Sequence, residues 1–225
     1  VEPSAAERAE LPAPDAVRLE VYHRDHGLAL SDVLPLLENL GFRVLEQNPY
    51  NLTVDGEHRG VDVYSVANAG GGPIDVEANR ARIVSALGLL LARGADNDRL
   101  NRLILHAGLT VRQVSLLRLY QMYYAQINPV ISRAFVNGAL LAHPDLAAVL
   151  VRYFETKFDP TRFGAAAGGA SLRPSQERLG ALSEIEQGFV DGLADVKSLA
   201  EDQVLRGLLD LMKATVRASY FLDLP

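Results

Sequence analysis

Few residues of this sequence have the types and spacing that chemistry needs, and the first group is a pair of histidines beside an acid. His23, Asp25 and His26 lie together in the segment HRDH. A divalent metal ion needs three or four converging ligands, and no third partner stands at an informative spacing, so a solvated loop is favoured over a metal site. The loop is a better candidate for a small ligand, because a strand-to-helix loop presents free backbone N–H groups near a helix N-terminus.

Other patterns that could carry catalysis are weak. Three glycines at 70–72 precede an expected helix, but neither the spaced glycines of a dinucleotide fingerprint nor the Gly-Lys-Ser/Thr of a phosphate loop is present, so a turn is favoured. No serine stands in a G-x-S-x-G elbow, and no Ser, His and Asp group forms a recognisable triad. Glu184 and Glu186 lie two apart, and such helix positions face different directions. We therefore expect no catalytic, cofactor-binding or metal-binding residue here.

An aromatic cluster lies late in an expected helix and combines Tyr120, Tyr123 and Tyr124 with Met122. It could line a cofactor pocket, but packing in a core or an interface is favoured. Arginines flank the cluster and could pair with carboxylates of a neighbouring domain. Exposed pairs of this kind contribute only ~0–1 kcal/mol, so they indicate contact and not stability. The candidate inter-domain residues are Arg102, Arg112, Arg118, Tyr120 and Tyr124.

The composition is that of an ordinary globular protein, with 225 residues, 48% of them hydrophobic, 22% charged and no cysteine. A formal net charge of −6 works against nucleic-acid binding, which usually needs a basic surface. The lack of cysteine excludes disulfides and fits a cytoplasmic location. The most apolar run, residues 83–92, is far shorter than the ~20 residues that span a bilayer, and the N-terminus shows no secretory pattern. Neither a membrane nor a nucleic acid is an expected partner.

The first part of the chain predicts a small mixed domain that follows a proline-containing linker at residues 1–16. Alternating apolar residues indicate strands, and apolar spacings of three and four indicate helices. Ser31 or Asp32 could cap the first helix, with Pro35 in its first turn, and Gly41 could end it. The predicted order over residues 17–94 is strand 17–22, helix 31–40, strand segments 42–45 and 51–54 around a turn-like Asn48-Pro49, strand 61–66, loop 68–73 and helix 74–93.

The rest of the chain predicts helices alone, which makes the fold class α+β, a β-α-β-β-α sheet domain followed by an all-α region. Asp96 or Asn97 could cap a helix that ends at Gly108, and Thr110 could cap the next one. A helical region is expected at 95–158, with helices at 110–127, 131–142 and 144–157, and a flexible loop is expected at 159–174. Residues 175–225 are expected to form an antiparallel hairpin of two helices. Each of these helices has a stripe of apolar residues that faces the other helix, and the second stripe runs through Val216 and Tyr220.

Three segments in series carry a family resemblance: LSDVLPLLENLGFRVLEQNPY (30–50), NRLILHAGLTVRQVSLLRLYQMYYAQ (101–126) and VKSLAEDQVLRGLLDLMKATVRASYF (196–221). Together they resemble the region preceding the catalytic domain of the very large bacterial NAD-dependent glutamate dehydrogenases. The resemblance implies that the sheet domain is similar to an ACT-type, ferredoxin-like regulatory domain and that the helices join it to the catalytic domain. In that family the catalytic lysine and the dinucleotide-binding glycines lie further along the chain. NAD is therefore expected in the full-length enzyme and no cofactor in this segment, which is expected to be inactive alone.

The resemblance also implies partners. We expect contacts with the chain's own catalytic domain and with other subunits of a homo-oligomer, and an amino-acid effector at the first strand-to-helix loop, formed by Asp25, His26, Gly27, Leu28 and Ala29. An ACT domain has a fourth strand after its second helix, whereas here Gly94 leads into helical sequence, so the sheet lacks a strand or takes one from upstream. The leading hypothesis is a regulatory and assembly segment; a free-standing amino-acid sensor and a helical interaction module are the alternatives.

Overall fold

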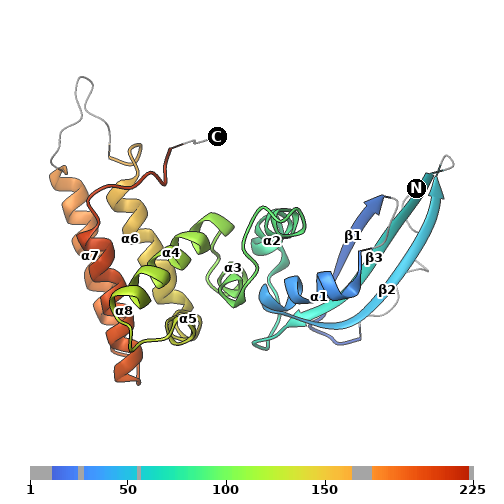
Figure 1. Ribbon diagram of the computed structural model, residues 1–225, viewed down its shortest axis with the longest axis horizontal. Helices are drawn as coiled ribbons and strands as arrows, with labels where there is room; N and C mark the ends of the chain where they lie inside the picture. Colours follow the sequence, from blue (N-terminus) through green and yellow to red (C-terminus); the bar gives the residue numbers. More distant parts are fainter. Residues whose placement is uncertain (1–11, 25–27, 55–56, 164–173, 223–225) are drawn as a thin grey trace. The chain divides into compact units, whose positions relative to one another are not determined.

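The chain divides into two compact units, residues 1–111 and residues 112–225, in a computed structural model that describes residues 12–24, 28–54, 57–163 and 174–222. The strands belong to the first unit, and the described elements of the second unit are helices (Figure 1). Each unit buries its own set of apolar side chains. The predicted α+β fold class is confirmed.

The sheet of the first unit has three antiparallel strands in the order β1-β3-β2. They are β1 (Val17–Arg24), β2 (Phe42–Val54) and the central β3 (Glu57–Asn68). Alternation along β3 places Asp62, Tyr64 and Val66 on one side, and because Tyr64 and Val66 are buried we call this side the inner face. Among the described strands, β1 lies at an edge of the sheet. The described elements after residue 76 are helices, as expected from the helical sequence that follows Gly94.

The turn-like interpretation of Asn48-Pro49 is wrong, because β2 runs without interruption through both residues. Pro49 pairs with Asp62, and the irregularity in the ladder lies earlier, between Val44 and Glu46. Proline cannot donate a backbone hydrogen bond and is therefore confined to edge strands and bulges. β2 is such an edge strand, so its position in the sheet explains why the strand continues.

Helix α1 (Leu30–Asn39) begins earlier than predicted, and neither Ser31 nor Asp32 caps it. Ala29 is the N-cap residue, without a side-chain bond, and its carbonyl accepts from the backbone N–H groups of Asp32 and Val33 at 2.9 and 3.2 Å. Pro35 consequently lies inside the helix and not in its first turn. The predicted end is confirmed, since Gly41 adopts a φ of +95° directly after the cap residue Leu40.

Helix α2 (Val76–Leu91) starts at Asp75, whose carboxylate accepts from the N–H of Ala78 at 3.0 Å. A short 3-10 turn, η2 (Arg99–Asn101), and helix α3 (Arg102–His106) complete the first unit. The cap of this segment is Asp98, which accepts from Leu100 N–H at 2.9 Å, and not Asp96 or Asn97 as predicted. α1 packs against β2 and α2, and also against η2.

The second unit is built around one helix that contacts three others. Its helices are α4 (Val111–Ile127), α5 (Arg133–Ala142), α6 (Pro144–Phe158), α7 (Gln176–Leu193) and α8 (Leu199–Ala214). α6 packs against α5, α7 and α8, and α7 lies most closely along α6 (Figure 1). The stripe predicted for the last helix does not continue through Val216 and Tyr220, because α8 ends at Ala214 and Val216 is exposed.

No single helix within the described ranges is both long and apolar enough to cross a membrane. α5 and α6 reach that length and composition only as a pair, and the chain bends by 100° between them.

Candidate functional site

A small polar cluster lies on the inner face of the sheet, where apolar packing would be expected. His23 comes from β1, Gln47 from β2, and Asp62 and Tyr64 from β3. His23 Nε2 lies 3.2 Å from the Asp62 carboxylate, and Gln47 Nε2 donates to Asp62 Oδ1 at 3.3 Å and to the Tyr64 hydroxyl at 3.5 Å. Asp62 is only 3% exposed. The strand register therefore places a histidine–carboxylate contact and two neutral polar groups together in a buried setting.

The geometry of this cluster depends on Gly60, which stands opposite His23 in the β1–β3 ladder. A Cβ atom at Gly60 would lie 1.9 Å from His23 Cε1, so the imidazole ring lies directly over a position that can carry no side chain. Burial, with a smaller contribution from the Asp62 charge, raises the pKa of Tyr64 to about 12. Tyr64 is therefore a neutral hydrogen-bonding group across the physiological pH range.

Two atoms of the cluster are buried without a hydrogen bond to any part of the described chain, His23 Nδ1 and Asp62 Oδ2, although Oδ2 faces the His23 ring. Buried polar groups normally have partners, so these atoms have hydrogen-bonding capacity for a ligand or a water molecule. The predicted effector loop follows β1 directly. Its residues Asp25, His26 and Gly27 lie outside the described residues; Leu28 is half-buried and Ala29 is exposed. Effector binding there stays a prediction.

The cluster does not form a metal site of the usual kind. Across the described part of the chain, no three His, Asp, Glu or Cys side chains converge. A single histidine and a single carboxylate fall short of the three or four ligands that a bound divalent ion needs.

Arg102, one of the predicted inter-domain residues, lies in α3 of the first unit beside Gly41. A Cβ at Gly41 would be 3.6 Å from Arg102 Cγ and 3.3 Å from His106 Nε2, so the turn after α1 is closely packed against α3. His106 Nε2 lies 3.2 Å from Asn68 Oδ1 at the end of β3. Burial, and secondarily the charge of Arg102, lower the pKa of His106, which favours the neutral ring.

Arg112 and Tyr120 hold the segment that follows α8. The Arg112 guanidinium donates to the carbonyl of Tyr220 and lies 4.8 Å from the centroid of the Tyr220 ring. The Tyr120 hydroxyl and Thr215 Oγ1 are 2.7 Å apart. Phe154 of α6 lies between these contacts, with its ring centroid 5.9 Å from that of Tyr120 and 5.3 Å from that of Tyr220. Residues 215–221 are therefore fixed to α4 and α6.

Lys157, in the last turn of α6, binds the end of α8. Its ammonium donates to the carbonyls of Met212, Lys213 and Thr215 at 3.0, 2.6 and 2.7 Å. The last carbonyls of a helix lack intrahelical partners and carry partial negative charge, so a cation is favourable there. One side chain thus ties the C-terminal end of α8 to α6.

Tyr124 and Arg118, the remaining predicted inter-domain residues, are buried within the second unit. Tyr124 packs on α8 at Gly207, where a Cβ would lie 2.3 Å from Tyr124 Cε2. Arg118 donates to Ser115 Oγ at 3.3 Å. Together with Arg112 and Tyr120, these residues make contacts inside their own unit; any contact with another domain stays a prediction.

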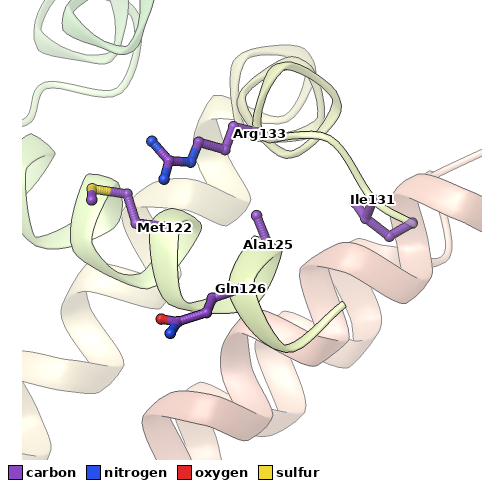
Figure 2. A pocket seen from close by; sticks show the side chains of 5 residues that line it. All are labelled: Met122, Ala125, Gln126, Ile131 and Arg133. Carbon is purple, nitrogen blue, oxygen red and sulfur yellow. The ribbon is translucent and has the colours of Figure 1, made fainter. Parts of the chain in front are cut away.

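One pocket of the second unit lies at the C-terminal end of α4 and has a volume of about 330 Å³. Figure 2 shows the Arg133 guanidinium extending toward the same side as Met122, with Ile131 at the opposite side and Ala125 between Met122 and Ile131. Gln126 completes the lining. The pocket therefore combines apolar side chains with the amide of Gln126 and one positive charge.

Sequence reasoning missed the two side chains that organise these sites. The acid partner of His23 is Asp62, far along the chain, and a strand register is needed to bring them together. Lys157 looks like an ordinary helix-terminal cation, and no pattern in the sequence connects it with the last turn of α8. Gly60 opposite His23 would indicate the first site, but the sequence shows this pairing only if the strand register is already known.

Two consecutive segments of the chain match two family models. Residues 5–79 match the ACT3 domain of glutamate dehydrogenase, and residues 95–160 match helical motif 3 of glutamate dehydrogenase. The first match contains the whole described sheet and α1, and the second contains η2 and the helices from α3 to α6.

Curated relatives agree with these models. The chain is 38% identical over 203 residues, 90% of its length, to an NAD-specific glutamate dehydrogenase of Pseudomonas aeruginosa, and 34% identical over 91% of its length to that of Halomonas elongata. It is 32% identical over 86% of its length to the enzyme of the same name from Mycobacterium tuberculosis. In each case the chain spans only 12% of the relative's length. The chain therefore carries two segments of the glutamate dehydrogenase type in sequence, the ACT3 domain and helical motif 3.

Proposed function

We propose that this chain is a non-catalytic regulatory and assembly segment of an NAD-dependent glutamate dehydrogenase. The full-length enzyme would convert L-glutamate to 2-oxoglutarate and ammonia in the cytoplasm, with NAD as the hydride acceptor. The observation that carries the proposal is the ordered match to an ACT3 domain and a helical motif across a chain that spans 12% of NAD-specific relatives. In this proposal the segment positions the catalytic domain within a homo-oligomer.

The contacts around α8 support a positioning role. Lys157, Arg112 and Tyr120 fix residues 215–221 to α4 and α6 through backbone and side-chain bonds. A segment held in this way leaves the helical unit at a defined point and in a defined direction. Such a fixed exit suits a part of the chain that must orient a further domain.

The test compares the 225-residue chain with the full-length polypeptide that carries it, each supplied with L-glutamate and NAD. We expect glutamate-dependent NADH formation, followed by absorbance at 340 nm, from the full-length polypeptide and none from the 225-residue chain. Turnover by the 225-residue chain would overturn the non-catalytic assignment. No turnover by the full-length polypeptide, with other dehydrogenase substrates tested in parallel, would overturn the assigned reaction.

We further propose that the first unit binds an amino-acid effector next to the inner-face cluster. The observation in favour is the buried His23 Nδ1, which has no hydrogen-bond partner within the described ranges and belongs to the strand that leads to Leu28 and Ala29. Its imidazole and the Asp62 carboxylate offer a donor–acceptor pair that the charged groups of an amino acid could use.

A thermal-shift panel of the twenty amino acids tests this second proposal on the 225-residue chain. A ligand at ~100 times its dissociation constant stabilises a protein by about 2.7 kcal/mol, which is readily detected. We expect one or a few amino acids to raise the melting temperature, His23→Asn to abolish the response, and Tyr22→Phe, on the same strand but 72% exposed, to retain it. An unresponsive wild-type chain would contradict effector binding and leave the positioning role intact.

A further inference from the structure

Helix α4 is apolar on two faces, and only one of them is packed within the described part of its unit. The packed face contains Val114, Leu117, Tyr120 and Tyr124, all buried. The other face carries a line of exposed apolar residues that we call the outer stripe: Leu119 (62% exposed), Met122 (44%), Tyr123 (50%) and Ile127 (49%). Spacings of three and four place these residues side by side along the helix.

The outer stripe adjoins the pocket at Met122, near the C-terminal end of α4. Val130 is 95% exposed, and the pocket with Arg133 begins at Met122, which belongs to both features (Figure 2). Single exposed apolar residues are common, but a contiguous line that ends in a pocket is characteristic of a contact surface. The outer stripe and the pocket therefore form an exposed, largely apolar surface with a charged residue, Arg133, at one end.

The charged residues near this surface indicate the chemistry of its partner. From Val111 to Ala142 the sequence contains no Asp or Glu, although the whole chain has a net charge of −6. Of the arginines in this stretch, Arg133 belongs to the surface, because Arg112 bonds to Tyr220 and Arg118 is buried within the unit. Two copies of the face would bring arginine against arginine with no carboxylate of the segment to pair with them, and like charges at an interface are unfavourable. A complementary partner must supply apolar side chains and carboxylates.

We propose that the outer stripe of α4 and the Arg133 pocket bind an amphipathic acidic helix that another part of the same dehydrogenase polypeptide contributes. The assignment of this helix to the same polypeptide rests on the function proposed above and on the length of the NAD-specific relatives, of which this chain spans 12%. The apolar face of that helix covers Leu119, Tyr123 and Ile127, and one of its carboxylates pairs with Arg133. An amphipathic helix binds through anchors spaced by three and four residues, which is also the spacing of the outer stripe.

Site-specific photo-cross-linking in the full-length polypeptide tests the proposal. A benzophenone amino acid replaces Tyr123 in one preparation and Arg152, an exposed residue of α6, in a control preparation. We expect efficient cross-linking from position 123 to a helical peptide outside residues 1–225 that contains Asp or Glu, and little from position 152. Arg133→Glu should lower the yield at position 123 because the carboxylates then repel, whereas Arg152→Glu should leave it unchanged.

The remaining outcomes overturn the proposal. They are a cross-link to residues 12–111, a cross-link to the same face of a second copy, a cross-link to an unrelated protein, and a yield at position 123 no greater than at position 152. NADH formation by the same preparations is measured separately. An active enzyme without the cross-link refutes the docking proposal alone, whereas the cross-link in a polypeptide inactive on glutamate refutes the proposed reaction alone.

Discussion

At the scale of single residues, Gly60 determines whether His23 and Asp62 can meet. The imidazole lies over Gly60, with 1.9 Å between His23 Cε1 and the position a Cβ would take. Gly60 does not have a positive φ angle, so its backbone conformation does not itself require glycine. The absence of a side chain is what the site requires, and a single methyl group is enough to displace the ring.

Gly60→Ala should destabilise the first unit by about 1–3 kcal/mol, the usual range for a group forced into filled space, because His23 must leave Asp62. Urea unfolding followed by circular dichroism measures the loss. Gly88→Ala in α2 is the matched control: its Cβ would meet no atom within 4 Å, so the helix should gain about 0.5–1 kcal/mol. Equal effects of the two substitutions would contradict the close contact. The double variant Gly60→Ala with His23→Ala should behave as if the clash had been removed.

Two tyrosines should titrate unusually late. Burial, aided by Asp62, raises the pKa of Tyr64 to about 12, and burial, aided by Glu155, raises the pKa of Tyr220 to about 12. An unfolded tyrosine ionises near pH ~10. Between these values the folded chain keeps protons that the unfolded chain has lost, so the stability due to both groups is complete below pH ~10 and is lost as pH rises toward 12.

Absorbance at 295 nm against pH measures this titration. Tyr64→Phe and Tyr220→Phe should each remove part of the late phase and leave the early phase unchanged. A titration curve of Tyr64→Phe that loses amplitude near pH ~10 instead would show that the Tyr64 hydroxyl is accessible to solvent.

At the scale of elements, the end of α8 is held by a neighbouring helix as well as by its own cap residue. Lys157 of α6 donates to three carbonyls at the end of α8, and Thr215 Oγ1 donates to Leu211 O at 2.8 Å. The Lys157 bonds satisfy acceptors that the helix itself leaves free. The end of α8 is therefore an inter-helix contact as well as a helix terminus.

Lys157→Met should destabilise the second unit by about 1.5–3 kcal/mol, the range for hydrogen bonds to a charged group, while keeping a similar apolar stem. Lys213→Met is the control, because Lys213 makes an exposed ion pair with Glu186 and such pairs contribute about 0–1 kcal/mol. Chemical denaturation gives both values. Hydrogen exchange of the amides after Ala214 should accelerate in Lys157→Met alone, and an unchanged exchange rate would contradict the tie between α6 and α8.

The elements also show what local sequence can and cannot predict. Gly41 and Gly108 end their helices as expected, because a residue with positive φ is a local requirement. Pro49 was misjudged, because its tolerance depends on β2 lying at an edge of the sheet. The cap at Asp98 lies close to the predicted Asp96 and Asn97, a choice among adjacent polar residues that local pattern does not resolve. The His23–Asp62 contact depends on register, which no short segment determines.

At the scale of the whole molecule, two compact units predict two steps of unfolding. Each unit has its own core, and the units meet in sequence at the start of α4, between Val111 and Arg112. A chain of this organisation departs from two-state behaviour when its units differ in stability. Calorimetry of the wild-type chain should therefore show a broadened or double transition.

The two substitutions described above separate the steps. Gly60→Ala should lower the temperature of one transition, and Lys157→Met should lower that of the other, since the residues belong to different units. The effects of distant substitutions are usually additive, so the double variant should show both shifts. A single transition that both substitutions move equally would show that the units unfold as one.

The three carbonyls bound by Lys157 also make α8 a helix of fixed length. Inserting one residue in α8 would turn its end by about 100° and move it by about 1.5 Å, so the carbonyls would no longer face the ammonium. The contact with Lys157 therefore determines where the segment after α8 begins relative to α6. α8 is thus a spacer that tolerates neither insertion nor deletion of a residue, and its fixed length also fixes the position at which the polypeptide beyond residue 215 begins.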